Sequence, residues 1–147
     1  MLDEKEISII QQLRKNARTN LVAISDATNI PKSTVFDKIG RLEGNTILKH
    51  TSIVDFKKLG FNSRYVFLVR VNPESRDSLR EFLSSHPSIN NLHITNSEYD
   101  YLFEGVFKDN REMNDFKTEL SDKFPIAIFR QHELIEDLQR EVFMEGK

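Results

Sequence analysis

The 147-residue chain contains no cysteine, so it forms no disulfide and offers no thiolate as a nucleophile or metal ligand. No apolar run approaches the roughly 18 residues that a membrane-spanning helix needs, and the charged N-terminal segment is unlike a signal peptide. These absences suit a protein that works inside the cell. We therefore expect a cytoplasmic location and no membrane partner.

The sequence also lacks the short motifs that mark common catalytic and cofactor sites. It contains no phosphate-binding P-loop, no G-x-S-x-G and no G-x-G-x-x-G. Its histidines, His50, His86, His93 and His132, are not spaced as metal ligands are, and no carboxylates cluster with them. We therefore expect no enzyme activity, no cofactor and no metal ion.

The chain has little net charge, −2 at pH 7, which taken alone argues against a nucleic-acid partner. The charge is unevenly distributed, however, because residues 1–60 hold 10 Lys and Arg against 7 Asp and Glu, and the remainder holds 11 against 16. A basic front part and an acidic back part favour a DNA-binding domain joined to a domain with another task. Since the basic surplus is modest, affinity for DNA would depend on dimerisation, which doubles the phosphate contacts.

What the chain does contain is a segment, residues 30–42, with one apolar and one polar face (I-P-K-S-T-V-F-D-K-I-G-R-L). Its apolar side chains Val35, Ile39 and Leu42 recur at i, i+4 and i+7, so a helix buries them together. The polar residues then fall on or beside the outer face: Ser33, Thr34, Asp37, Lys38 and Arg41. Hydroxyl groups in the first turn, with cations further along, are typical of a recognition helix that enters the major groove of DNA.

The neighbouring segments complete the outline of a winged helix-turn-helix over residues 1–54. Asp3 and Glu6 form a capping-box pattern before a first helix with an apolar stripe of Ile7, Ile10 and Leu13. The remaining expected elements are a helix at residues 20–27, with Leu21, Ile24 and Ala27 facing inward, and a hairpin at residues 46–54, with Lys49 and His50 at its tip.

A linker over residues 55–63 leads to a second domain, residues 64–147. Its expected elements are strands at 65–71, 89–95, 101–107 and from 126 to about 135, and helices at 75–84 and 110–123. This βαββαβ order predicts a ferredoxin-like α+β domain. Residues 136–147 carry both a helical and an alternating pattern, and their structure stays open.

The ferredoxin-like arrangement leaves one face of its sheet uncovered, because both helices lie on the other face. Tyr65, Phe67, Phe103 and Phe107 are compatible with either face. One sheet cannot bury both of its faces alone, so we expect the domain to dimerise through the uncovered face.

Three stretches resemble the Lrp/AsnC (feast/famine) family of archaeal and bacterial transcription regulators: L-D-E-K-E-I, I-P-K-S-T-V-F-D-K-I-G-R-L-E and T-S-I-V-D-F-K-K-L-G-F. The resemblance covers residues 2 to 61 closely, and residues 94–102 are similar to the T-G-x-Y-D-L-L segment of the family. It implies a sequence-specific DNA-binding transcriptional regulator that acts as a homodimer, tetramer or octamer. It also implies, as in many members, a response to an amino-acid effector.

Two sets of site residues follow from the pattern and from the resemblance. The residues expected to contact double-stranded DNA are Lys32, Ser33, Thr34, Asp37, Lys38, Arg41, Lys49 and His50. The residues expected to hold an effector, at a contact between dimers, are Thr95, Ser97, Glu98 and Asp100. Three positions depart from the family pattern. Asp37 stands where relatives often carry a base, and Pro31 stands where they often place the capping serine. Gly40 weakens its helix by about 1 kcal/mol relative to alanine.

Two alternatives share this architecture. Siroheme decarboxylases have the same two-domain layout, with a porphyrin pocket lined by His, Arg and Tyr. Where they carry R-x-H-x-Y-N, residues 96–100 are N-S-E-Y-D and lack both the Arg and the His. A ligand sensor that does not bind DNA is the second alternative, and the basic outer face of residues 32–41 argues against it.

Overall fold

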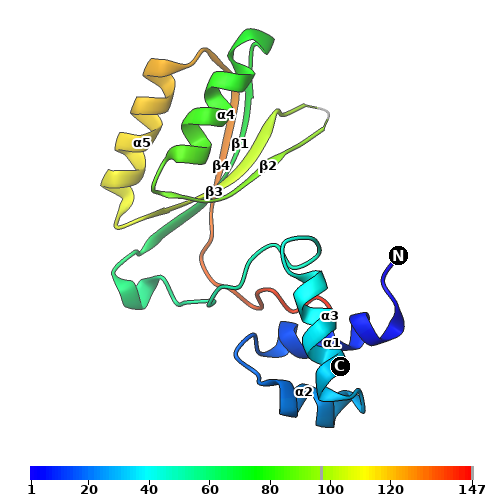
Figure 1. The fold of residues 1–147 in the computed structure, drawn as a ribbon. Coiled ribbons are helices and arrows are strands. Elements are labelled where there is room, and N and C mark those ends of the chain that lie inside the picture. Colours follow the sequence, from blue (N-terminus) through cyan, green and yellow to red (C-terminus); the bar gives the residue numbers. More distant parts are fainter. Residues whose placement is uncertain (97, 147) are drawn as a thin grey trace. The chain divides into compact units, whose positions relative to one another are not determined.

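A computed structural model describes residues 1–96 and 98–146, which form two compact units (Figure 1). The helical unit comprises Met1–Ile53 together with the segment that begins at Leu138. The sheet unit comprises Val54–Asp137. In chain order, the sheet unit is therefore an insertion within the helical unit.

The helical unit contains α1 at Glu4–Lys15, α2 at Leu21–Thr28 and α3 at Lys32–Leu42. The start of α1 is a reciprocal capping box, in which the Asp3 carboxylate accepts the Glu6 N–H and the Glu6 carboxylate accepts the Asp3 N–H. Asn20 caps α2 by accepting the N–H of Ala23. Pro31 precedes α3, where its fixed φ suits helix entry.

The core of the helical unit joins all three helices through Ile9, Ile24, Ile30 and Val35. The predicted apolar face of α3 is confirmed, since Val35 and Leu42 are buried and Ile39 packs against this core. The three helices consequently present one side of α3 to the protein and the other to solvent.

The predicted apolar faces of α1 and α2 need correction. Ile9 is fully buried in α1, whereas Ile7 is 36% exposed, so the predicted stripe has the wrong phase. Ile9 and Leu13, four residues apart, lie on the side over which α2 and α3 pack. Ala27 is exposed near the end of α2, because Ile30 in the following turn fills the core in its place.

The hairpin expected over residues 46–54 does not form in the described structure. A single bridge joins Glu43 and Ile47, and residues 48–55 have no regular secondary structure. A two-stranded hairpin is marginal unless one face packs on a core, and here Leu48 and Ile53 are exposed. The helix-turn-helix is thus followed by an irregular segment instead of a paired wing.

The sheet unit has the predicted ferredoxin-like order of elements (Figure 1). Its elements are β1 at Ser63–Val71, α4 at Arg76–Ser85, β2 at Ile89–Ile94, β3 at Tyr101–Phe107, α5 at Asn110–Lys123 and β4 at Ile126–Glu133, with 3-10 turns at Lys57–Leu59 and Pro73–Ser75. The strands lie in the order β2-β3-β1-β4, and every neighbouring pair is antiparallel. Helices α4 and α5 cover the same face of this sheet (Figure 1).

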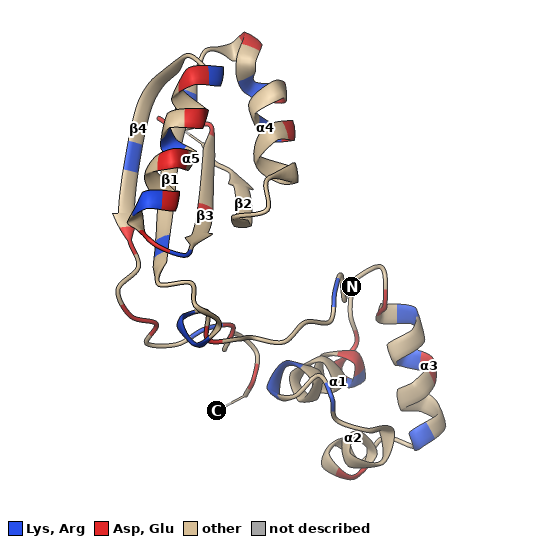
Figure 2. Cartoon of the chain, turned by 90° about the vertical axis from the view of Figure 1, so that its left-hand side faces the viewer, with Lys and Arg blue, Asp and Glu red and all other residues tan. Residues whose placement is uncertain are grey.

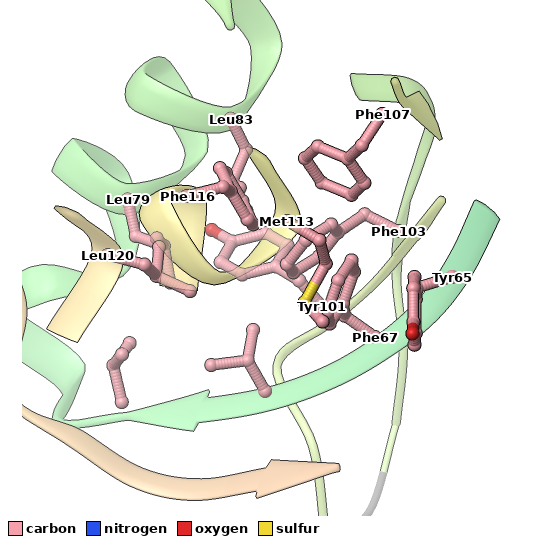
Figure 3. Close-up of a cluster of buried hydrophobic side chains, with 12 residues drawn as sticks. Tyr65, Phe67, Leu79, Leu83, Tyr101, Phe103, Phe107, Met113, Phe116 and Leu120 are labelled. Atoms are coloured by element: carbon pink, nitrogen blue, oxygen red, sulfur yellow. The ribbon is translucent and has the colours of Figure 1, made fainter. Parts of the chain in front are cut away.

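The covered face holds an aromatic core around Phe67 (Figure 3). The ring centroid of Phe67 lies 5.0 Å from that of Phe103 and 5.8 Å from that of Phe116 on α5. Gly105 lies beneath these rings, where an added Cβ would stand 2.6 Å from the Phe107 ring and 3.0 Å from the Phe67 ring. Only glycine fits this position without movement of a ring.

The uncovered face of the sheet mixes aliphatic side chains with charged ones, among them Arg64, Glu104 and Arg130. Tyr65, Phe67, Phe103 and Phe107, which the sequence allowed on either face, all lie on the helix-covered face. The strand register places half-buried aliphatic side chains together on the uncovered face: Val66, Leu68, Leu102, Val106 and Ile128. These aliphatic side chains would therefore still be buried further by a partner that packs on this face.

The segment after Leu138 belongs to the helical unit, which corrects the predicted extent of the second domain, residues 64–147. The Arg14 guanidinium donates to the carbonyl oxygens of Phe143 and Glu141, at 2.9 Å each, and pairs with the Glu141 carboxylate at 3.3 Å. These contacts hold the segment, called the tail below, against α1.

Candidate nucleic-acid interface

The solvent side of α3 is formed by six exposed residues, called the outer face below: Lys32, Ser33, Phe36, Asp37, Gly40 and Arg41. Four of the predicted DNA contacts lie there: Lys32, Ser33, Asp37 and Arg41. Thr34, another predicted contact, is half-buried beside them. Figure 2 shows basic positions toward both ends of α3 with an acidic position between them. The cations are thus placed to contact phosphates while Ser33 and Asp37 lie between them.

Lys38, which the sequence pattern assigns to DNA, does not lie on the outer face. It is only 8% exposed, and its Nζ lies 2.5 Å from Asp3 Oδ2 and 3.5 Å from Glu6 Oε1. The side chain extends along the body of the unit and places its cation at the capping box of α1. Its predicted phosphate contact is therefore corrected to a contact between α3 and α1.

The ion pair shifts both of its titrating groups. The hydrogen bond from Lys38 lowers the pKa of the Asp3 carboxyl below its usual 3.8. The same hydrogen bond raises the pKa of the Lys38 ammonium group above its usual 10.5, against the opposing effect of desolvation. Both groups are therefore charged throughout the neutral range.

Phe36 is a residue of the outer face that the sequence-based site does not include. It is 65% exposed, although phenylalanine is usually buried. The signal was present in the sequence, because Phe36 follows buried Val35 and lies three residues after Ser33 on the same side of the helix.

Lys49 and His50 lie in the irregular segment and not at the tip of a hairpin. Both are exposed, and His50 Nε2 lies 3.2 Å from Glu43 Oε1. The predicted basic tip therefore consists of Lys49 and a histidine already paired with a carboxylate.

The predicted effector residues belong to the segment between β2 and β3, and one of them, Asp100, already makes contacts within the protein. Asp100 Oδ1 lies 2.8 Å from Arg76 Nε, and Asp100 Oδ2 accepts the Val71 N–H at 2.9 Å. Thr95 Oγ1 donates to the Tyr99 carbonyl at 2.9 Å. Both oxygens of Asp100 therefore already have a partner within the sheet unit, and its expected role as the acceptor for an effector's ammonium group stays a prediction.

The two other predicted effector residues are Glu98 and Ser97. Glu98 is exposed, and Ser97 lies outside the described residues. A hollow of about 460 Å³ lies beside the turn and is lined by Arg80, Ser84, Leu92, His93, Ile94 and Tyr101. Its lining combines one guanidinium group with hydroxyl groups and aliphatic side chains.

Within residues 1–96 and 98–146, no three His, Asp or Glu side chains are placed to hold a metal ion. No helix in those ranges is long and apolar enough to cross a membrane.

Comparisons with known proteins agree with this geometry. A family profile described as winged helix-turn-helix DNA-binding matches residues 2–45, which contain α1, α2 and α3. The HTH-type transcriptional regulator FL11 of Pyrococcus furiosus is 30% identical over 117 residues, covering 79% of this chain and 78% of the relative.

Solved structures match the whole fold. The structure of LrpC from Bacillus subtilis superposes with a TM-score of 0.82 at 20% identity, covering 95% of this chain and 98% of the other. A transcriptional regulator from Neisseria meningitidis, solved as a complex with L-Met, superposes with a TM-score of 0.85 at 18% identity, covering 95% and 94%. Both the helix-turn-helix and the ferredoxin-like sheet are therefore shared with these proteins.

Proposed function

Since the chain belongs to the Lrp/AsnC family of DNA-binding transcriptional regulators, we propose that the outer face of α3 is the surface that reads double-stranded DNA. The exposure of Lys32, Ser33 and Arg41 on one side of a helix-turn-helix carries this proposal. That motif consists of two helices, here α2 and α3, of which the second lies in the major groove. The first residues of this recognition helix contact base edges, and its cations contact phosphates. For a protein with this role we also expect a cytoplasmic location.

A titration with salt tests the assignment of the outer face. A duplex is first selected from a random pool by the full chain, and its affinity is then measured against salt for the parent protein and Arg41→Ala. Loss of one phosphate contact should weaken binding. It should also flatten the slope of log affinity against log salt concentration by about one for each protomer bound. Arg111→Ala removes the same charge from an exposed position of α5 and should leave both quantities unchanged. If Arg41→Ala binds like the parent, the outer face is not the interface.

We also propose that two chains associate through their sheet units to form a homodimer, and that such dimers can assemble into larger rings. The half-buried aliphatic side chains on the uncovered sheet face, such as Leu68 and Leu102, support this proposal. Apolar side chains that pair across neighbouring strands on an otherwise uncovered sheet face mark a surface that a partner can cover. Paired protomers should bind half-sites spaced by about 10 base pairs, one helical turn, or by a multiple of that spacing.

A small effector with the chemistry of an amino acid fits the hollow beside the turn between β2 and β3. The Arg80 guanidinium can bind a carboxylate there, and Leu92 and Ile94 can contact an aliphatic side chain. The related regulator from Neisseria meningitidis was solved with L-Met, so that amino acid is the first to test. Calorimetry with the twenty amino acids should show heat for at least one, and Arg80→Gln should abolish it. No heat across the set would indicate an effector-independent regulator.

The enzyme alternative predicts a different measurement. A siroheme decarboxylase would bind a porphyrin, which has a strong visible absorbance band. The relatives named above are transcriptional regulators, and we therefore expect the purified protein to bind duplex DNA and to show no such band after incubation with a porphyrin.

A further inference from the structure

We propose that Phe36 and Gly40 form a reading surface for the 5-methyl group of thymine in the major groove. This inference rests on the proposed DNA-binding role of the outer face. It goes beyond that role by naming the base, the chemical group on it, and the two residues that recognise it.

The first observation is the position of Phe36. Its ring is 65% exposed in the middle of α3, whereas the preceding residue, Val35, is fully buried. The core of the helical unit does not use the ring. An apolar ring on a polar helix face is therefore available to a partner outside this unit.

The second observation is that the fold does not require glycine at position 40. A Cβ added to Gly40 would meet no atom within 4 Å, in contrast to Gly105, where it would meet the ring of Phe107. Glycine inside a helix is unfavourable relative to alanine, because it loses more backbone entropy on folding. Its presence in an uncrowded helix interior indicates that something outside the chain approaches the backbone closely at this point.

The two positions act together because they are neighbours on the helix. Phe36 and Gly40 are four residues apart, so Gly40 lies beside the ring on the same face. The missing side chain at position 40 leaves space next to the ring, into which a flat group with a methyl substituent can enter. Ser33, one turn before Phe36, and the flanking Lys32 and Arg41 supply the polar and cationic contacts that hold a duplex over this space.

DNA chemistry then identifies the ligand group. In the major groove, A, G and C present only hydrogen-bond donors and acceptors, whereas T also presents a 5-methyl group. Phenylalanine is among the side chains that contact this methyl group through apolar surface. A hydroxyl, a carboxylate and an aromatic ring side by side would thus read a T·A pair beside a pair recognised by hydrogen bonds.

Replacement of single thymines by deoxyuridine tests this proposal, because the change removes one methyl group and leaves base pairing intact. A duplex selected by the parent protein is substituted at one thymine at a time. At one position in each half-site, the affinity should fall about fourfold, the value of one buried methyl group. Phe36→Ala should bind the thymine duplex more weakly and show no difference between thymine and uracil at that position.

Variants at the same two positions serve as controls. Phe36→Leu keeps an apolar side chain and should retain part of the discrimination between thymine and uracil. Gly40→Ala should raise the melting temperature of the protein and yet lower its affinity for the selected duplex, a combination that simple misfolding cannot produce.

The outcomes are distinguishable from those of the proposed function. If the parent binds DNA but tolerates uracil at every position, or if Phe36→Ala keeps the discrimination, the methyl-reading role of Phe36 is wrong. If Gly40→Ala binds as tightly as the parent, close approach at Gly40 is wrong. A parent protein that binds no duplex at all overturns the proposed function, and this inference with it.

Discussion

Lys38 holds the recognition helix to the start of α1, because its ammonium group lies within 3.5 Å of both acidic residues of the capping box. Lys38→Met keeps the aliphatic stem but removes the cation that these carboxylates share. We expect a lower melting temperature and an unchanged salt dependence of DNA binding, since no phosphate contact is lost. Arg41→Met is the matched control, and it should leave the melting temperature unchanged but flatten the salt dependence of DNA binding. A flatter salt dependence for Lys38→Met would return Lys38 to the DNA interface.

The same ion pair predicts a pH dependence of stability. The pKa of Asp3 is lowered on folding, so its contribution is complete above about pH 3.8 and is lost as the pH falls through the lower folded value. The pKa of Lys38 is raised, so its contribution is present below pH 10.5 and is lost as the pH rises through the higher folded value. Asp3→Asn retains an N-cap side chain but not the charge. Thermal melts across the acid range should show a smaller loss of stability for Asp3→Asn than for the parent.

At the scale of the secondary-structure element, two glycines should respond to alanine in opposite directions. Gly105 in β3 lies under the rings of Phe107 and Phe67, so Gly105→Ala forces the core apart and should cost about 1–3 kcal/mol of unfolding free energy. Gly40 in α3 is uncrowded, and Gly40→Ala should stabilise the protein by up to about 1 kcal/mol. Urea unfolding measures both. Equal effects at the two positions would contradict the packing described for β3.

The elements differ in how well their sequences predict them. The strand at Tyr101–Phe107 and the helix at Asn110–Lys123 were predicted with their observed bounds, because alternation and helical spacing are unambiguous there. In α1, closely spaced isoleucines allow two helix phases, and only packing against α2 and α3 selects Ile9. A lysine such as Lys38 reads as solvent-facing in any sequence, since its partner Asp3 lies 35 residues away and the pair forms only in the folded chain.

At the scale of the whole molecule, the uncovered sheet face predicts a dimer that one charge can break. Leu68 lies on the middle of this face, opposite Leu102 in the neighbouring strand. Leu68→Arg places a cation where the partner would pack, and burial of an unpaired charge is strongly unfavourable. Light scattering at micromolar concentration should show a folded monomer. Val22→Arg, at an exposed position of α2, should remain dimeric. A parent protein that is itself monomeric would contradict the proposed role of the sheet face.

The insertion of the sheet unit within the helical unit has a consequence for the order of events during synthesis. The core of the helical unit runs from Ile9 to Val35, so it can assemble on the ribosome before the strands of the sheet can pair. Strand β1 then waits for its neighbour β4, whose Ile126 pairs with Val71, and the tail that Arg14 holds emerges later still. The nascent chain thus acquires its three N-terminal helices well before the sheet face through which we propose that two chains associate. A newly made protomer therefore passes through a stage in which its helical unit is folded but the chain has not yet associated with a second copy.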